Sequence, residues 1–199
     1  MDLKYVNIAD VIGPPVNIAL PDRLRHTDTL ATDGVREGDP VLDAAPMFDL
    51  IELFFFAYRD FVSDADRLLA IYGFGRAHHR VLHFVTRQPG MTIAGLLDIL
   101  RITKQSLNRV MKDLVDQDFI ELRPGVSDRR HRLLFATVKG RRLALDLAAV
   151  QSQRFERVLA SLPPGAHEQA RRFLLAVIDE RDRDAVRDRV APPLAIAGS

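Results

Sequence analysis

A short polar segment between apolar stretches carries side chains suited to reading the edges of nucleic-acid bases. Amide side chains bond adenine edges, whereas arginine and lysine bond guanine or phosphate. Hydroxyl and backbone N–H groups at the start of a helix bind phosphate. The side chains in question are Thr103, Lys104, Gln105, Ser106, Asn108, Arg109 and Lys112. Their types predict contact with double-stranded DNA rather than catalysis.

The spacing of the apolar residues predicts that this segment is a helix with one buried face. Leu107, Val110, Met111 and Leu114 recur at three- and four-residue intervals, and Thr103 stands at the N-cap position. The polar side chains are therefore left on the solvent side. The alternative interpretation is an ordinary solvated helix face.

Two short strand candidates follow this helix. Phe119–Leu122 and Arg132–Phe135 are apolar enough for strands, and Pro124–Asp128 between them has the composition of a loop. This arrangement predicts a β-hairpin beside the helix, which is the form of a wing.

The predicted hairpin carries a run of arginines near its turn. Arg129, Arg130 and Arg132 are suited to a narrow minor groove, whose negative potential favours an inserted arginine. Asp128 is expected to orient an arginine, because a carboxylate is repelled by phosphate. The alternative interpretation is a charged, solvated hairpin.

Helical periodicity accounts for most of the remaining chain. An apolar face begins at Phe48 and is broken at Gly73 and Gly75, and a second helix ends at Pro89-Gly90. Thr92 then caps a short helix. Thr137 caps a long helix that runs to about Leu159, and a last helix is expected from about Ala166 to the late 180s. The sequence therefore predicts a mainly α fold, a winged helix-turn-helix with a small β-hairpin wing and long N- and C-terminal helices.

The division of the chain follows from the same patterns. Residues 1–45 lack a sustained period and are expected to form an extended N-terminal arm. Residues 46–190 are expected to form the winged domain, with a DNA-binding lobe at about 75–140. Residues 191–199 are expected to be a loose tail.

Charge and composition narrow the function class further. Residues 1–60 hold 5 Lys/Arg against 11 Asp/Glu, whereas residues 101–141 hold 10 against 5, which indicates a localised polyanion contact. The absence of cysteine excludes disulfides and thiolate metal sites. The N-terminus does not have the pattern of a signal peptide, so a cytoplasmic protein is expected. No catalytic motif is recognisable, and we expect no enzyme.

Three histidines have spacing that suits metal ligands. His79 and His83 lie four residues apart, with His78 adjacent, and a third ligand would have to come from Asp60 or Asp64. Such histidines also suit axial haem ligation. The simpler interpretation is a structural role, and we expect no metal and no cofactor.

The helix, the hairpin and the junction after it resemble the MarR family of bacterial transcriptional regulators. Thr103–Leu114 is similar to the family's recognition helix, Asp128–Gly140 to its wing, and Thr137-x-x-Gly140 to the junction into the next helix. The resemblance covers about Leu50 to Phe155. Tyr72–Arg80 is further similar to the branch that includes PetP-type regulators. Asp118 replaces a common glycine and Ala136 a common leucine.

The resemblance implies further partners and sites. It implies a homodimer built from the N- and C-terminal helices, and Asp128 and Arg130 as the key pair of the wing. It also implies a cleft for a small aromatic or anionic effector, with the alternative that its aromatic residues are only core. The candidate lining residues are Phe55, Tyr58, Arg59, His79 and His83.

Three functions are compatible with these patterns. The first is a homodimeric, sequence-specific transcriptional regulator, a repressor by resemblance, that binds a pseudo-palindromic operator and responds to an effector. The second is a constitutive or architectural DNA-binding protein without an effector. The third is a winged-helix protein-interaction module, against which the basic stretch argues.

Overall fold

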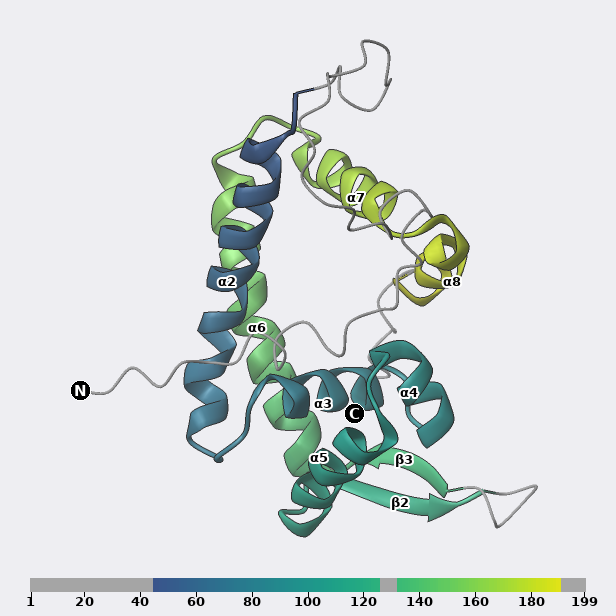
Figure 1. Cartoon of the computed structure of the whole chain (residues 1–199). Helices are drawn as coiled ribbons and strands as arrows, with labels where there is room; N and C mark the ends of the chain where they lie inside the picture. Colours follow the sequence, from purple (N-terminus) through teal and green to yellow (C-terminus); the bar gives the residue numbers. More distant parts are fainter. Residues whose placement is uncertain (1–44, 126–131, 191–199) are drawn as a thin grey trace, which may run out of the picture.

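The computed structural model describes residues 45–125 and 132–190 (Figure 1). The predicted mainly helical winged helix-turn-helix is confirmed. The expected arm and tail lie outside the described residues, apart from Ala45. Within those ranges, no helix combines the length and apolarity needed to cross a membrane. The elements are α2 (Phe48–Ala70), α3 (Arg76–Arg87), β1 (Met91–Thr92), α4 (Ile93–Leu100), α5 (Lys104–Asp116), β2 (Ile120–Pro124), β3 (Arg132–Ala136), α6 (Val138–Ala160), α7 (Ala166–Val177) and α8 (Glu180–Val190).

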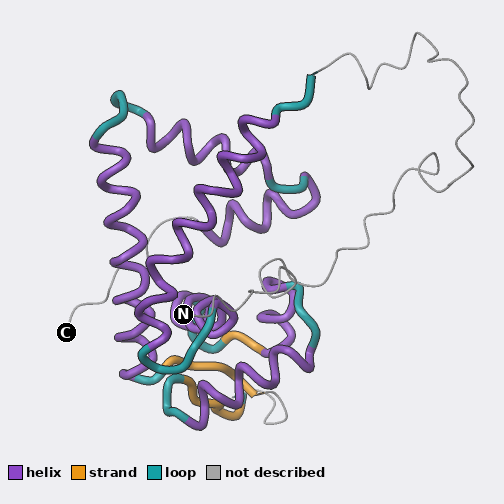
Figure 2. The backbone as a smooth tube through the Cα atoms, turned by 60° about the vertical axis from the view of Figure 1, so that its left-hand side comes forward, coloured by secondary structure: helices purple, strands orange, loops and turns teal. Residues whose placement is uncertain are grey.

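The two longest helices, α2 and α6, lie side by side and form a stalk above the helix-turn-helix lobe (Figures 1 and 2). Arg154 of α6 donates to the Asp64 carboxylate of α2 at 2.6 Å, and the Phe61 and Phe155 rings lie 5.2 Å apart. The bond from Arg154 lowers the pKa of Asp64. The stalk is therefore joined by both an ion pair and apolar contact.

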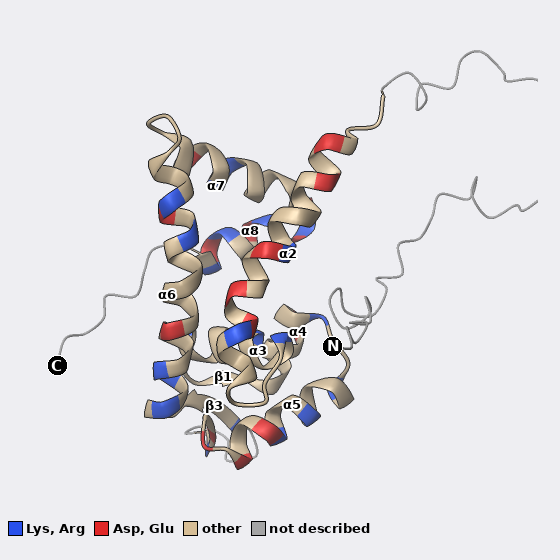
Figure 3. Ribbon diagram, turned by 90° about the vertical axis from the view of Figure 1, so that its left-hand side faces the viewer, with Lys and Arg blue, Asp and Glu red and all other residues tan. Residues whose placement is uncertain are grey.

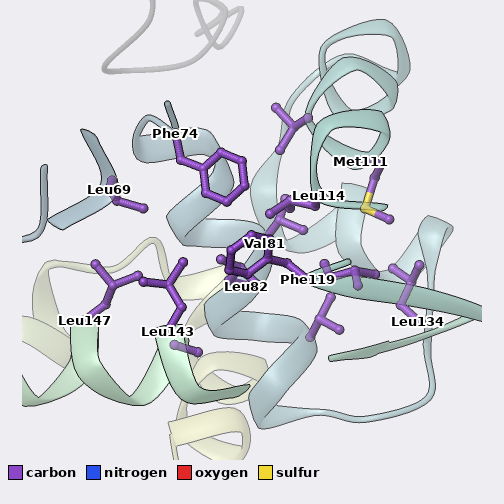
Figure 4. Packing of buried hydrophobic residues seen from close by; sticks show 14 of the residues in the cluster. Leu69, Phe74, Val81, Leu82, Met111, Leu114, Phe119, Leu134, Leu143 and Leu147 are labelled. Carbon is purple, nitrogen blue, oxygen red and sulfur yellow. The ribbon is translucent and has the colours of Figure 1, made fainter. Parts of the chain in front are cut away.

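The hydrophobic core lies where α3, α5, the sheet and the lower half of α6 meet (Figure 4). Its buried members include Leu69 of α2 and Leu143, Ala144 and Leu147 of α6, so the core joins the lobe to the stalk. Each fully buried leucine contributes about 1.5–3 kcal/mol relative to an exposed one. The largest buried side chains are Phe119, Leu69, Leu82, Leu96, Leu107, Leu114, Ile120, Leu134 and Leu147.

Three threonines cap helices, as the sequence predicts. The hydroxyl oxygens of Thr92, Thr103 and Thr137 each accept a hydrogen bond from a backbone N–H three residues later, at 3.0–3.2 Å. These caps fix where α4, α5 and α6 begin, because each satisfies a backbone donor that has no partner within its helix.

The sheet has three strands rather than the two of the predicted hairpin. β2 pairs with β3 as expected, with Ile120 opposite Ala136, and β1 adds Met91 and Thr92 antiparallel to β3. The two-residue β1 has no alternating pattern of its own, so its strand character depends on the pairing partner.

The single C-terminal helix predicted from Ala166 to the late 180s is wrong, because the structure has two helices there. The backbone of Ile178 is extended, with ψ of 139°. The Arg183 guanidinium donates to the carbonyl oxygens of Ala176 and Ile178. These bonds satisfy carbonyl groups at the end of α7 that would otherwise bond the next turn of a continuous helix.

The junction between the wing and α6 requires a glycine. A Cβ atom on Gly140 would lie 1.9 Å from the carbonyl oxygen of Phe119. That oxygen accepts a hydrogen bond from the Thr137 N–H at 3.1 Å, and the Thr137 hydroxyl donates to the Asp118 carbonyl at 2.7 Å. Asp118 itself has φ of 61°, the left-handed conformation that its short side chain tolerates.

Candidate nucleic-acid interface

Helix α5 presents one continuous polar face to solvent. Counting 100° per residue, its polar positions 104, 105, 108, 109 and 112 fall within an arc of about 140°. All five residues are exposed, while Leu107, Val110, Met111 and Leu114 are buried on the opposite side. Figure 3 marks basic positions in blue along the ribbon of this helix. A rigid helix with this face fits the width of the DNA major groove.

Four side chains on this face are without a partner among the residues that the structure describes. Within the described residues, Lys104, Gln105, Asn108 and Arg109 make no side-chain hydrogen bond or ion pair. Their donors and acceptors are therefore available to base edges and phosphates, at no cost of breaking an internal contact.

The other three predicted contact residues on α5 are already engaged. The Thr103 hydroxyl accepts from the Ser106 N–H and donates to the Ser106 hydroxyl at 2.9 Å. The Lys112 ammonium bonds the Asp116 carboxylate, which raises the pKa of Lys112. Thr103 thus acts first as a cap, and Lys112 must leave Asp116 to reach phosphate.

The strands of the wing lie beside α5 (Figure 2). The register places Pro124 opposite Arg132 at the end of the strand pair from which the connecting segment leaves. Arg132 is exposed there. The guanidinium of Arg123, which the sequence analysis did not select, lies 4.5 Å from the centre of the Phe135 ring and bonds Glu121. The predicted contacts Arg129 and Arg130, and the predicted orienting residue Asp128, lie outside the described residues.

A cleft opens between α2, α3 and α6. Of the predicted effector residues, Tyr58, His79 and His83 line it. Phe55 and Arg59 do not: Phe55 packs edge-on against Phe56, and Arg59 turns to Asp60 and the Phe56 ring. The sequence analysis missed the remaining lining residues, which are Phe61, Val62, Arg76, Arg80, Phe84 and Gln151. The sequence does indicate Arg76 and Arg80, because positions 76, 79, 80 and 83 share one face of a helix.

The two histidines of the cleft are neutral near pH 7. Burial lowers the pKa of His79 to about 4, and the nearby His83 adds to this shift. Burial also lowers the pKa of His83. The positive charge of the cleft therefore comes from Arg76 and Arg80, and the Arg80 guanidinium donates to the Tyr58 hydroxyl at 3.2 Å.

The histidines do not form a metal centre in the part of the chain that the structure describes. No cluster of three or more His, Asp or Glu side chains arranged to hold a metal occurs among those residues. His78 points away from the cleft's polar groups: its ring stacks on Phe74, and its nitrogens contact Gly75 and Asp113. Asp64, a suggested third ligand, is bound to Arg154 instead.

A large apolar surface is exposed along the stalk and the C-terminal helices. On the N-terminal half of α2 the apolar side chains surround the whole helix, which is typical of a helix buried on all sides. Patches of this size mark interaction sites. The exposed residues include Phe48, Leu50, Ile51, Leu53, Phe54, Phe55, Phe56, Phe155, Val158, Phe173, Leu174 and Val177.

Comparison with known proteins adds independent information. A sequence model described as the MarR family matches residues 72–131. The HTH-type transcriptional regulator PetP of Rhodobacter capsulatus is 43% identical over 129 residues, which cover 65% of this chain and 78% of PetP.

Solved structures share the fold. The crystal structure of MarR has a TM-score of 0.55 at 20% identity, covering 74% of this chain and 95% of MarR. A SlyA-like regulator from Listeria monocytogenes has a TM-score of 0.57 at 18% identity, covering 71% of this chain and 91% of the regulator. MarR-family regulators generally act by binding rather than by catalysis. With the winged fold, the polar face of α5 and the match to PetP, this chain belongs to the MarR family and is a DNA-binding transcriptional regulator.

Proposed function

We propose that the protein is a homodimeric, sequence-specific repressor that reads a pseudo-palindromic operator through α5. The observation that carries this proposal is the polar face of α5, where Lys104, Gln105, Asn108 and Arg109 are exposed and uncommitted. Gln105 and Asn108 supply bidentate contacts to adenine, and Arg109 or Lys104 contacts guanine or phosphate. Thr103, Ser106 and Lys112 hold phosphates at the flanks.

The wing extends this contact into the neighbouring minor groove. Arg132 begins β3 directly after the segment that connects the two strands, and Arg129 and Arg130 stand just before it in the sequence. Arginine is favoured in a narrow minor groove, so this second contact adds preference for DNA shape. Asp128 orients one of these arginines.

The dimer forms through the apolar surface of α2, α6 and α7. Phe54, Phe155 and Phe173 are each about half exposed in the single chain, and a second copy of the chain covers them. A winged module alone buries little DNA, whereas two modules related by a twofold axis match two half-sites.

A small molecule regulates the repressor from the cleft between α2, α3 and α6. The cleft combines the aromatic Tyr58, Phe61 and Phe84 with the cationic Arg76 and Arg80, which suits a small aromatic anion. The ligand contacts both the stalk and the lobe, so its binding favours one spacing of the two recognition helices. The protein acts in the cytoplasm, by binding rather than catalysis and without a metal or cofactor. Its winged domain spans residues 46–190, after an N-terminal arm and before a short tail.

The test is fluorescence anisotropy with duplex DNA from upstream of the protein's own gene, against a scrambled duplex of equal length. We expect selective binding that weakens steeply as salt rises, because phosphate contacts release counterions. Equal affinity for both duplexes favours an architectural protein. Weak, salt-independent binding favours a protein-interaction module.

A further inference from the structure

The first turn of α3 lies between the stalk and the recognition helix. Arg76 and His78 are two positions apart in this turn, so their side chains leave the helix about 200° apart. Arg76 contacts α2 and His78 contacts α5. One helical turn therefore touches both the element that forms the proposed dimer and the element that reads DNA.

The contact with the stalk is a well-formed ion pair. The Arg76 guanidinium donates to Asp66 Oδ2 through Nε at 3.0 Å and through Nη2 at 2.9 Å. The two side chains are only 25% and 35% exposed. The planar guanidinium thus holds the first turn of α3 against α2 through two bonds to one carboxylate.

The contact with the recognition helix is set by the two nitrogens of one ring. His78 Nδ1 accepts the Gly75 N–H at 3.1 Å, so in the neutral ring the proton lies on Nε2. Nε2 then donates to Asp113 Oδ2 of α5 at 3.2 Å. Stacking on the Phe74 ring, 4.6 Å away at 9°, holds the ring in this orientation. The side chain of His78 is only 13% exposed.

We propose that His78 is a positioning residue that fixes α5 to the first turn of α3, and that Arg76 fixes the same turn to α2. The pair forms a clamp through which the stalk sets the placement of the recognition helix. This inference rests on the proposed reading of the operator by α5. Arg76 and His79 of the same turn also line the cleft. The clamp therefore connects the cleft to the recognition helix.

Four variants separate the clamp from the capping of α3. His78→Gln keeps both contacts, because its amide oxygen accepts from Gly75 and its amide nitrogen donates to Asp113. His78→Glu keeps the cap, since glutamate is an ordinary residue for this position, but places a second carboxylate against Asp113. The double variant His78→Glu/Asp113→Asn exchanges donor and acceptor and restores the bond. Asp113→Asn alone still accepts from His78.

The first measurement is hydrogen exchange of the α5 amides in the full chain. We expect exchange about three- to tenfold faster in His78→Glu, with α6 unchanged, and normal protection in the other three variants. Equal protection in His78→Glu, or no recovery in the double variant, overturns the clamp. Asp116→Asn is the control, because it removes a negative charge from α5 at a position away from α3.

The second measurement is operator affinity of the same variants. We expect a loss of about three- to tenfold for His78→Glu and recovery in the double variant, because a displaced α5 loses base contacts. The two measurements separate the claims. If exchange changes as expected but the unaltered protein binds no DNA selectively, the clamp holds and the proposed function fails.

Discussion

Replacement of Gly140 by alanine tests the packing of the wing against α6. The added Cβ would stand 1.9 Å from the Phe119 carbonyl oxygen and 2.9 Å from its carbon. Normal contacts of a Cβ atom exceed 3.0 Å, so the backbone of Phe119, just before β2, has to move by about 1 Å. The obstacle is backbone, which cannot rotate away as a side chain does.

The size of the effect follows from three contributions. Overpacking of this kind costs about 1–3 kcal/mol, and a rigid backbone obstacle places it near the upper end. Moving the carbonyl also weakens its bond from the Thr137 N–H, at about 1 kcal/mol. Alanine regains about 1 kcal/mol of helix propensity. We therefore expect a loss of about 3 kcal/mol, and a fall in Tm of about 6–12 °C for a chain of this length.

Gly95 supplies a matched control. It occupies the same position in α4 that Gly140 has in α6, and its N–H also bonds the N-cap threonine. A Cβ on Gly95 would meet Thr92 Oγ1 at 3.4 Å, which is ordinary contact. Gly95→Ala should therefore leave the protein equally stable or slightly more stable.

The assay is thermal and urea unfolding of both variants at one fixed protein concentration, because a dimer's Tm depends on concentration. A Gly140→Ala protein as stable as the unaltered one would refute the steric argument. An equal loss in Gly95→Ala would show that the cap, and not the close approach of Phe119, makes glycine necessary.

Three further predictions concern DNA reading, assembly and pH. Asn108→Ala should relax base preference at one position of each half-site. Lys104→Ala should weaken binding to all DNA sequences alike if Lys104 contacts phosphate, and a panel of single-base operator changes distinguishes the two results. Phe54→Glu should give a monomer in sedimentation velocity, because it places a charge in the proposed interface. Ile71→Glu, directly after the C-terminal end of α2, should stay dimeric. The depressed pKa of His79 should make stability fall as pH drops from about 6.5 to 4, since the unfolded chain binds a proton there that the folded one does not. After discounting for partial exposure, we expect this group to account for a loss of about 1–2 kcal/mol in the free energy of unfolding. The urea midpoint of His79→Gln should therefore fall less between pH 7 and 5 than that of the unaltered protein, and an identical fall would contradict this.

The fold was predictable wherever the determining contacts are local. Thr92, Thr103 and Thr137 satisfy donors three residues away, so their caps are visible in the sequence itself. Asp118, which stands where the family commonly has glycine, has the left-handed conformation that a short polar side chain tolerates.

The elements that were missed depend on partners elsewhere. β1 is a strand only because Met91 and Thr92 pair with Leu134 and Leu133 of β3. The break between α7 and α8 has no proline or glycine to signal it, and depends on Arg183 reaching back to the end of α7.

The candidate site likewise has a part that depends on local sequence and a part that depends on distant contacts. The polar face of α5 follows from helical spacing, so its residues were identified correctly as one exposed surface. The cleft depends on how α2 packs against α3 and α6, and periodicity within one helix does not give that angle. Phe55 and Arg59 therefore lie outside the lining of this cleft, and Gln151 of α6, which the sequence analysis did not select, lies in it.

The most direct test of the account is operator binding with altered spacing between the half-sites. Footprinting first defines the site upstream of the gene, and about five base pairs, half a helical turn, are then inserted at its centre. A dimer that reads two half-sites with two copies of α5 should bind this DNA no better than scrambled DNA, and regain affinity when the insertion is about ten base pairs. Undiminished affinity with the half-turn insertion would contradict paired reading by two recognition helices.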